Sequence, residues 1–88
     1  MSFETVLKAA QDGDPDAQTA MGYLFFKGEG VMQDHREAAR WFGLASDQGN
    51  PEAMCNLAYI KAHGFGVRCD LEGAMALYER SAELGYIK

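Results

Sequence analysis

The chain has 88 residues, of which 48% are apolar and 24% charged, and eight Lys and Arg stand against thirteen Asp and Glu. This composition is typical of one small acidic globular domain. The basic residues are scattered and the formal net charge is -5, so we expect no nucleic-acid partner. No run approaches the roughly 18 apolar residues that a membrane-spanning helix needs, so we expect no membrane partner. Residues 1–8 lack the pattern of a signal peptide, which predicts a cytoplasmic location.

Helix-forming residues dominate the composition. Alanine is frequent, whereas Val, Ile and Thr, the branched residues that favour strands, are few. We therefore predict an all-α fold. Its first element is a helix within residues 1–12, where Phe3, Val6, Leu7 and Ala10 recur at the spacing of one helix face.

Two copies of one unit follow, at residues 13–48 and 49–84. A displacement of 36 residues superposes Gly13 and Gly49, Pro15 and Pro51, Ala17 and Ala53, Tyr23 and Tyr59, Gly28 and Gly64, Gly30 and Gly66, Val31 and Val67, Asp34 and Asp70, and Ala38 and Ala74. A fixed period of this length indicates stacked repeats. Residues 1–12 match the second half of an earlier copy, and residues 85–88 the start of a truncated further one.

Each copy predicts two helices, A and B, joined by a glycine-containing loop. In the first copy, Asp14 precedes Pro15, which indicates the capped start of helix A, and Gly28 indicates its end. Asp34 then caps helix B, and Glu37, three residues later, completes a predicted capping box. The cap and glycine signals recur in the second copy. The whole chain is therefore predicted to form about five helices stacked as a short α/α solenoid.

The predicted core alternates small and large side chains. In the first copy it consists of Ala17, Met21, Leu24 and Gly28 from helix A, and Ala38, Trp41, Phe42 and Ala45 from helix B. The second copy places Ala53, Leu57, Ile60, Gly64, Ala74, Leu77, Tyr78 and Ser81 at the same positions. Such alternation allows neighbouring helices to interlock.

The repeated pattern resembles the Sel1-like repeat, a relative of the tetratricopeptide repeat. The resemblance rests on the Gly28-x-Gly30-Val31 loop, on Asp34 and on Ala38, and it recurs at the same period in the second copy. It implies an α/α solenoid scaffold that holds protein complexes together, without catalysis as a rule. Separately, a chain this short has little room for a deep pocket beside its core, so we expect no cofactor.

We predict that the A helices line a concave face that binds a peptide or protein segment. The predicted binding residues are Thr19, Tyr23, Phe26 and Lys27 in the first copy and Cys55, Tyr59 and His63 in the second. Tyrosines at equivalent positions, together with Phe26, form the kind of amphipathic patch that is enriched at interface centres. The alternative is that the tyrosines fill gaps against the neighbouring helix A.

Residues that could carry chemistry are few. Cys55 and His63 lie roughly 12 Å apart along one helix, too far for a nucleophile and its base. Together with His35 and Cys69 they lack the spacing of metal ligands, so we expect no metal. The Gly-x-Gly loops follow helices and lack Lys-Ser/Thr, which disfavours phosphate binding. We expect two reduced thiols, no catalytic residues and an ordinary packing role, or a partner contact, for Phe65.

The second hypothesis concerns the ends of the solenoid. No helix A covers the last helix B, which leaves an apolar face open. The chain is then either part of a longer repeat array or a self-associating assembly module, with Leu84, Tyr86, Ile87 and Phe3 buried between copies. An enzymatic or small-ligand role is disfavoured, because no catalytic constellation is visible.

Overall fold

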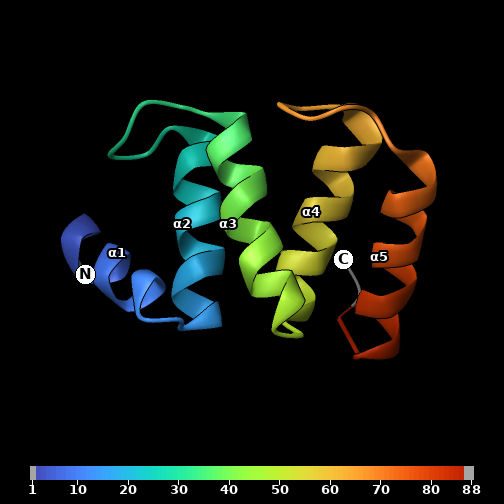
Figure 1. Cartoon of the computed structure of the whole chain (residues 1–88), viewed down its shortest axis with the longest axis horizontal. Helices are drawn as coiled ribbons and strands as arrows, with labels where there is room; N and C mark the ends of the chain where they lie inside the picture. The colour runs from blue at the N-terminus through green and yellow to red at the C-terminus, as the bar shows by residue number, and fades with distance from the viewer. Residues whose placement is uncertain (1, 87–88) are drawn as a thin grey trace.

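Five helices follow one another in residues 2–86, the part of the chain that the computed structural model describes (Figure 1). They are α1 (Phe3–Gln11), α2 (Pro15–Lys27), α3 (His35–Asp47), α4 (Pro51–His63) and α5 (Leu71–Glu83). The predicted all-α fold, with one leading helix and two helix pairs, is confirmed. Ile87 and Lys88, at the predicted start of a further repeat, lie outside the described residues.

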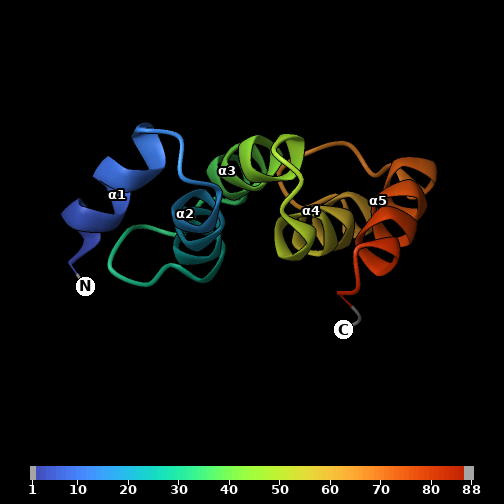
Figure 2. The same ribbon diagram turned by 90° about the horizontal axis from the view of Figure 1, so that it is seen from below.

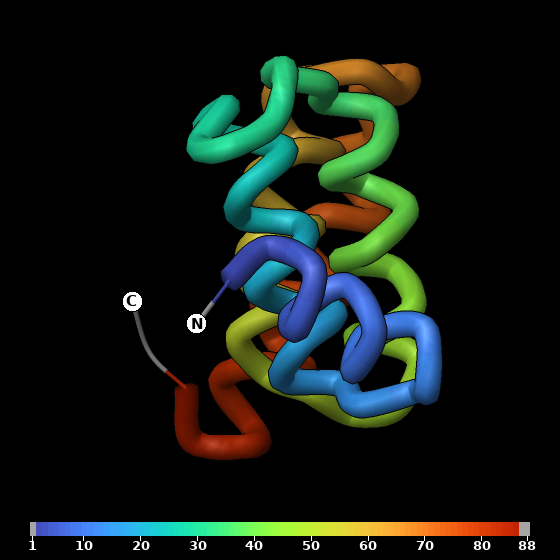
Figure 3. Tube along the Cα trace, turned by 90° about the vertical axis from the view of Figure 1, so that its left-hand side faces the viewer, coloured from blue at the N-terminus to red at the C-terminus, as the bar shows by residue number. Residues whose placement is uncertain are grey.

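The helices stack side by side along the longest of the molecule's dimensions, 34 × 24 × 19 Å. In Figure 2, α2 and α4 lie on the same side of α3. Seen from the α1 end, the later helices lie behind one another, as a solenoid requires (Figure 3). None of the helices in residues 2–86 has the length and apolarity to cross a bilayer. The expected cytoplasmic location stays a prediction.

Local signals set the helix ends. The Asp14 carboxylate accepts hydrogen bonds from the backbone of Asp16 at 2.9 Å and of Ala17 at 3.4 Å, and α2 ends at Gly28 with φ 75°. Asn50 and Gly64 perform the same roles for α4. The predicted start and end of each helix A are therefore confirmed.

The predicted capping box is only half formed. The Asp34 carboxylate accepts from the backbone N–H groups of Arg36 and Glu37, as expected. The Glu37 carboxylate instead pairs with Arg40 at 3.1 Å, and the Asp34 N–H donates to the carbonyl of Phe25 at 2.9 Å. The prediction of the full box is wrong because both groups of its second half have other partners.

Helix α3 divides the core into two clusters. Trp41 packs with Ala10 and Met21, which joins α3 to α1 and α2. Phe42, the next residue, packs in a cluster that includes Ile60 of α4. Phe3 packs against the first cluster, within its own chain. One helix thus connects α1 and α2 to α4.

The ring of Phe42 lies directly against the backbone of Gly22. A methyl group on the Gly22 α-carbon would come within 2.6 Å of this ring. Gly43, also inside a helix, has nothing within 4 Å of the equivalent point. Close packing against Phe42 therefore requires glycine at position 22, whereas no neighbour requires it at position 43.

We expect Gly22→Ala to lower the free energy of unfolding by about 1–3 kcal/mol, because the added methyl overpacks a filled core. Gly43→Ala is the matched control and is expected to raise it by about 0.5–1 kcal/mol, because alanine favours the helix and meets no neighbour. Thermal and urea unfolding followed by circular dichroism measure both changes. Equal effects of the two substitutions would contradict the packing role of Gly22.

Candidate functional site: a groove between two helices

A cavity of about 600 Å³ lies between α2 and α4, and we call it the central groove. Its walls come from these two helices, with single residues of α3 and α5. The lining residues are Tyr23, Phe26, Lys27, Phe42, Glu52, Cys55, Asn56, Tyr59, Ile60 and Tyr78. This size is typical of a site that takes a few side chains of a ligand.

The structure brings most of the predicted binding residues together. Tyr23, Phe26, Lys27, Cys55 and Tyr59 all line the central groove. Thr19 lines a neighbouring cavity, and the ring of His63 lies 4.3 Å from that of Tyr59. The predicted residues therefore lie near one another in the fold. Its use in binding stays a prediction.

Two of these residues are more buried than predicted. Thr19 is 5% exposed and Cys55 is 7% exposed. The Thr19 hydroxyl donates to the carbonyl of Pro15 at 2.8 Å. The prediction placed these two side chains on the face of helix A opposite its buried residues, and this is wrong. Neighbouring helices cover more of each helix A than the single row of core residues.

Tyrosines form the edges of the central groove. Tyr23 is 46% exposed and Tyr59 is 45% exposed, in agreement with their equivalent places in the two copies. The Lys27 ammonium lies 5.9 Å from the centre of the Tyr23 ring, within the range of a cation–π contact. These edges offer both apolar area and hydrogen-bonding groups to a ligand.

Tyr78 is a groove residue that the sequence analysis placed in the core. It occupies the position of the buried Phe42, yet it is 39% exposed. Burial raises the pKa of its phenol, and the nearby Cys55 and Tyr59 add to the increase. Its hydroxyl is therefore protonated at neutral pH and can donate a hydrogen bond into the groove.

An aromatic cluster adjoins the groove at the loop that follows α4 and shares Phe26 and Tyr59 with it. Phe65 lies at its centre, with ring centroids 5.0 Å from His35, 5.4 Å from His63, 5.9 Å from Phe26 and 5.9 Å from Tyr59. The cluster joins α2, α3 and α4 to the loop. Phe65 thus packs inside the chain, the more ordinary of its two expected roles, and the sequence analysis missed the contribution of His35.

This loop lies directly against the start of α3. A methyl group at Gly66 would come within 2.6 Å of the Arg36 nitrogen and 2.7 Å of the His35 carbonyl carbon. Gly66 also has a φ of 72°, in the left-handed region. Gly30, its counterpart in the first copy, has a φ of 76° but nothing within 4 Å. Glycine at 66 is therefore required by space as well as by backbone conformation.

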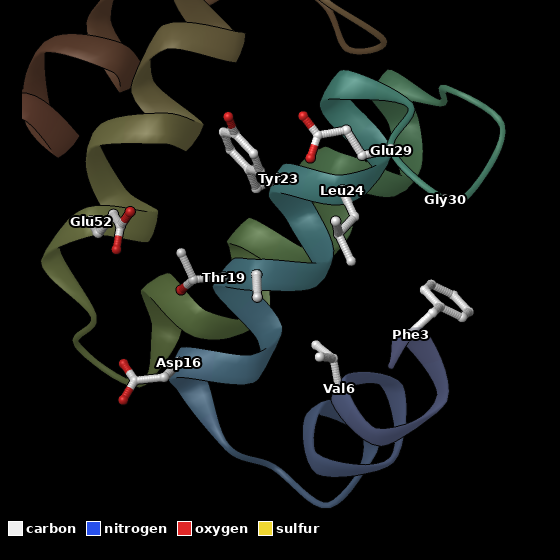
Figure 4. Close-up of a pocket in the computed structure, with 10 residues that line it drawn as sticks. Phe3, Val6, Asp16, Thr19, Tyr23, Leu24, Glu29, Gly30 and Glu52 are labelled. Atoms are coloured by element: carbon white, nitrogen blue, oxygen red, sulfur yellow. The ribbon is translucent and has the colours of Figure 1, made fainter. Parts of the chain in front are cut away.

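A second cavity of about 590 Å³ adjoins the central groove on the α1 side, and we call it the N-terminal cavity (Figure 4). Its lining residues are Phe3, Val6, Asp16, Thr19, Ala20, Tyr23, Leu24, Glu29, Gly30 and Glu52. Tyr23 and Glu52 line both cavities. The repeat pattern does not predict this cavity, because it depends on where α1 docks.

The thiols and the possible metal ligands are dispersed. Cys55 is buried and Cys69 exposed, and both are free. The Cys69 thiol donates to the carbonyl of Ala62 at 3.3 Å. Within residues 2–86, no three His, Cys, Asp or Glu side chains gather as metal ligands would. The groups that reach the central groove are suited to recognition by contact, hydrogen bonding and charge.

Comparison with a family model finds two matches to the Sel1 repeat, at residues 15–50 and 51–86. Each match has the same length as a predicted unit and begins two residues after it. "Protein sel-1 homolog 2" of Homo sapiens is 40% identical over 77 residues, which cover 86% of this chain and 11% of the relative. "ERAD-associated E3 ubiquitin-protein ligase component HRD3B" of Arabidopsis thaliana is 38% identical over 76 residues, which cover 86% of this chain and 13% of the relative.

Solved structures show the same architecture. A Sel1 repeat protein from Oxalobacter formigenes has a TM-score of 0.90 at 41% identity, over 92% of this chain and 24% of that one. The protective antigen c5321 of uropathogenic Escherichia coli, with an SLR fold, has a TM-score of 0.90 at 32% identity, over 92% and 17%. The chain therefore spans a quarter or less of the length of each of these relatives.

We expect Gly66→Ala to destabilise the protein more than Gly30→Ala does. Both substitutions place a side chain in the left-handed region, at a cost of about 1–2 kcal/mol. Only Gly66→Ala also forces the loop away from α3, which adds about 1–3 kcal/mol and alters the aromatic cluster. Urea unfolding gives the energies, and the ring proton shifts of Phe65 in NMR spectra report the displacement. Equal losses with unchanged ring shifts would show that the loop does not depend on this close approach.

Proposed function

The chain belongs to the Sel1 repeat family, and we propose that it is a non-enzymatic adaptor that binds a peptide or protein segment in the central groove. Proteins with these repeats are generally adaptors for protein interactions, and the Arabidopsis relative is named as a ubiquitin-ligase component. The single observation that carries the proposal is the pair of half-exposed tyrosines at equivalent places on the two edges of the groove.

The groove has the composition of a protein-binding surface. Tyr23 and Tyr59 present large rings with few rotatable bonds, so binding orders them at low entropic cost. Phe26 adds apolar area between them, and its ring centre lies 6.2 Å from that of Tyr59. Aromatic side chains of this kind dominate the binding energy of many interfaces.

Polar groups along the groove provide specificity. Lys27, Asn56 and Glu52 line it together with the tyrosine hydroxyls. An amide and two opposite charges can pair with the backbone and side chains of a bound segment. These groups support recognition of a polypeptide, which offers donors, acceptors and apolar side chains at regular intervals.

We expect the double variant Tyr23→Ala/Tyr59→Ala to lose at least about tenfold in affinity for a bound partner, because it removes both aromatic edges. Peptides selected on the wild-type chain from a displayed 12-residue random library serve as the probe, with affinity measured by fluorescence anisotropy. Leu44→Ala is the matched control, since Leu44 is 40% exposed and lines neither cavity. Its affinity should equal that of the wild type.

Circular dichroism separates loss of binding from loss of structure. Both tyrosines are nearly half exposed, so the double variant should keep its helical signal. Unchanged peptide affinity in the double variant, or collapse of its helical signal, would contradict the assignment of these tyrosines to a binding surface.

A second candidate function, self-association, is favoured by the outer face of α5. Leu71 and Met75 on this face are each 62% exposed. The α3 residue at the position of Met75 is Ala39, which is only 9% exposed and belongs to the cluster that packs α3 against α4. The α5 face therefore has the position and the apolar character of a surface that receives a helix. We propose that a second copy of the chain covers it.

The prediction of this second candidate is that Met75→Glu abolishes dimer formation, because the charge would have to be buried between copies. Sedimentation velocity over a wide concentration range measures the mass, and Leu44→Glu is the control outside the α5 face. A wild-type chain that stays monomeric throughout would remove this candidate. It would leave the groove proposal untouched.

A further inference from the structure

We infer that the segment bound by this chain is basic, and that one cationic and one apolar side chain of it enter the N-terminal cavity. The inference rests on the proposed function, because it names the partner of the same binding face. Its starting point is the continuity of the two cavities, which share Tyr23 and Glu52. A segment that crosses the central groove therefore meets the N-terminal cavity at the edge formed by Tyr23.

The charged residues that line the N-terminal cavity are all acidic. They are Asp16 at the start of α2, Glu29 in the following loop and Glu52 at the start of α4. In Figure 4 the Asp16 and Glu52 carboxylates lie on the Thr19 side of α2, and the Glu29 carboxylate lies towards the other end of α2, near Tyr23. Neither of the ion pairs found within residues 2–86 involves any of the three. The Asp16 carboxylate accepts a hydrogen bond from the neutral Asn50 amide at 3.1 Å, which leaves its negative charge in place. The charge of all three can therefore attract an incoming cation.

The concave shape of the N-terminal cavity strengthens the negative potential of these carboxylates. Carboxylates around a concave surface with apolar walls focus their potential on the space between them. Such a site raises the local concentration of cations and disfavours anionic segments. The net charge of -5 acts in the same direction over a longer range. Among the side chains of a polypeptide, lysine and arginine carry the positive charge that this potential attracts.

The walls of the same cavity are apolar. Phe3 and Val6 of α1 lie opposite Leu24 of α2 (Figure 4), and Ala20 also lines the cavity. A purely ionic ligand would leave this surface in water. A leucine-sized or aromatic side chain next to the cation would cover it, so the cavity favours a basic segment with an apolar neighbour over a simple polycation.

The central groove differs in charge and gives the bound segment a direction. Lys27 lines the central groove but not the N-terminal cavity, whereas Glu29 lines only the N-terminal cavity. Tyr23 lies at the boundary between them. The basic part of the segment should therefore lie on the α1 side of Tyr23, and any acidic or neutral part should lie towards Lys27.

The test uses peptides selected on the wild-type chain from a displayed random 12-residue library, followed by affinity measurement on synthetic copies. The variants are Glu29→Lys and, as a matched control with the same change in net charge, Glu83→Lys on α5, which lines neither cavity. Glu29 is an exposed loop residue, so its substitution should leave the fold intact. Tyr59→Ala serves as the variant that touches only the central groove.

The inference predicts that the selected peptides are enriched in Lys or Arg next to an apolar residue. Glu29→Lys should weaken their binding about tenfold and Glu83→Lys less than about twofold, and added salt should weaken it several-fold. Chemical-shift changes in NMR spectra should include Val6, Ala20 and Glu29.

Three results would overturn it, and they differ in meaning. Peptides without basic enrichment, which depend on Tyr59 but not on Glu29, would refute the basic partner and leave the groove adaptor standing. A library from which no peptide is enriched on the wild-type chain would refute both proposals. Equal weakening by Glu29→Lys and Glu83→Lys would show attraction by net charge alone and would also overturn the site.

Discussion

The packing of α3 on both of its sides is the constraint on which the other features depend. Trp41 and Phe42 are neighbours in the sequence, yet they belong to different core clusters. The Trp41 cluster includes α1 and α2, and the Phe42 cluster includes Ile60 of α4, while the Phe42 ring also lies against Gly22 of α2. Because both clusters anchor on one rigid helix, the separation of α2 from α4 is fixed. The width of the central groove follows from this separation, and so does the placement of the tyrosines on its edges.

Features that depend on neighbours in the sequence were predictable. Caps such as Asp14 and C-terminal glycines such as Gly28 act within a few residues, and they gave the helix ends correctly. The period of 36 residues fixed the number and order of the helices. Features that depend on distant segments were not predictable. Cys55 is buried by the helices around it, and the Asp34 N–H donates to the carbonyl of Phe25 on the preceding helix, so the predicted capping box is not completed.

The candidate site shows the same division. Tyr23 and Tyr59 were found from the repeat, because equivalent positions in two copies face the same way. The N-terminal cavity has no counterpart in the repeat pattern, since it requires α1, which represents only part of a unit. Its acidic lining joins residues from three separate elements. Only the folded arrangement brings these charges around one space.

The loop that carries Gly66 has a consequence for how the solenoid folds and evolves. It lies on the first residues of α3, so the second unit cannot complete its aromatic cluster until the start of α3 is in place. Neighbouring units are thereby coupled, and their unfolding should be cooperative rather than stepwise. A unit transplanted from another array would fit here only if its loop kept a glycine that approaches the preceding helix as closely. The exchange of units is thus limited by the backbone of the junction more than by the side chains of the core.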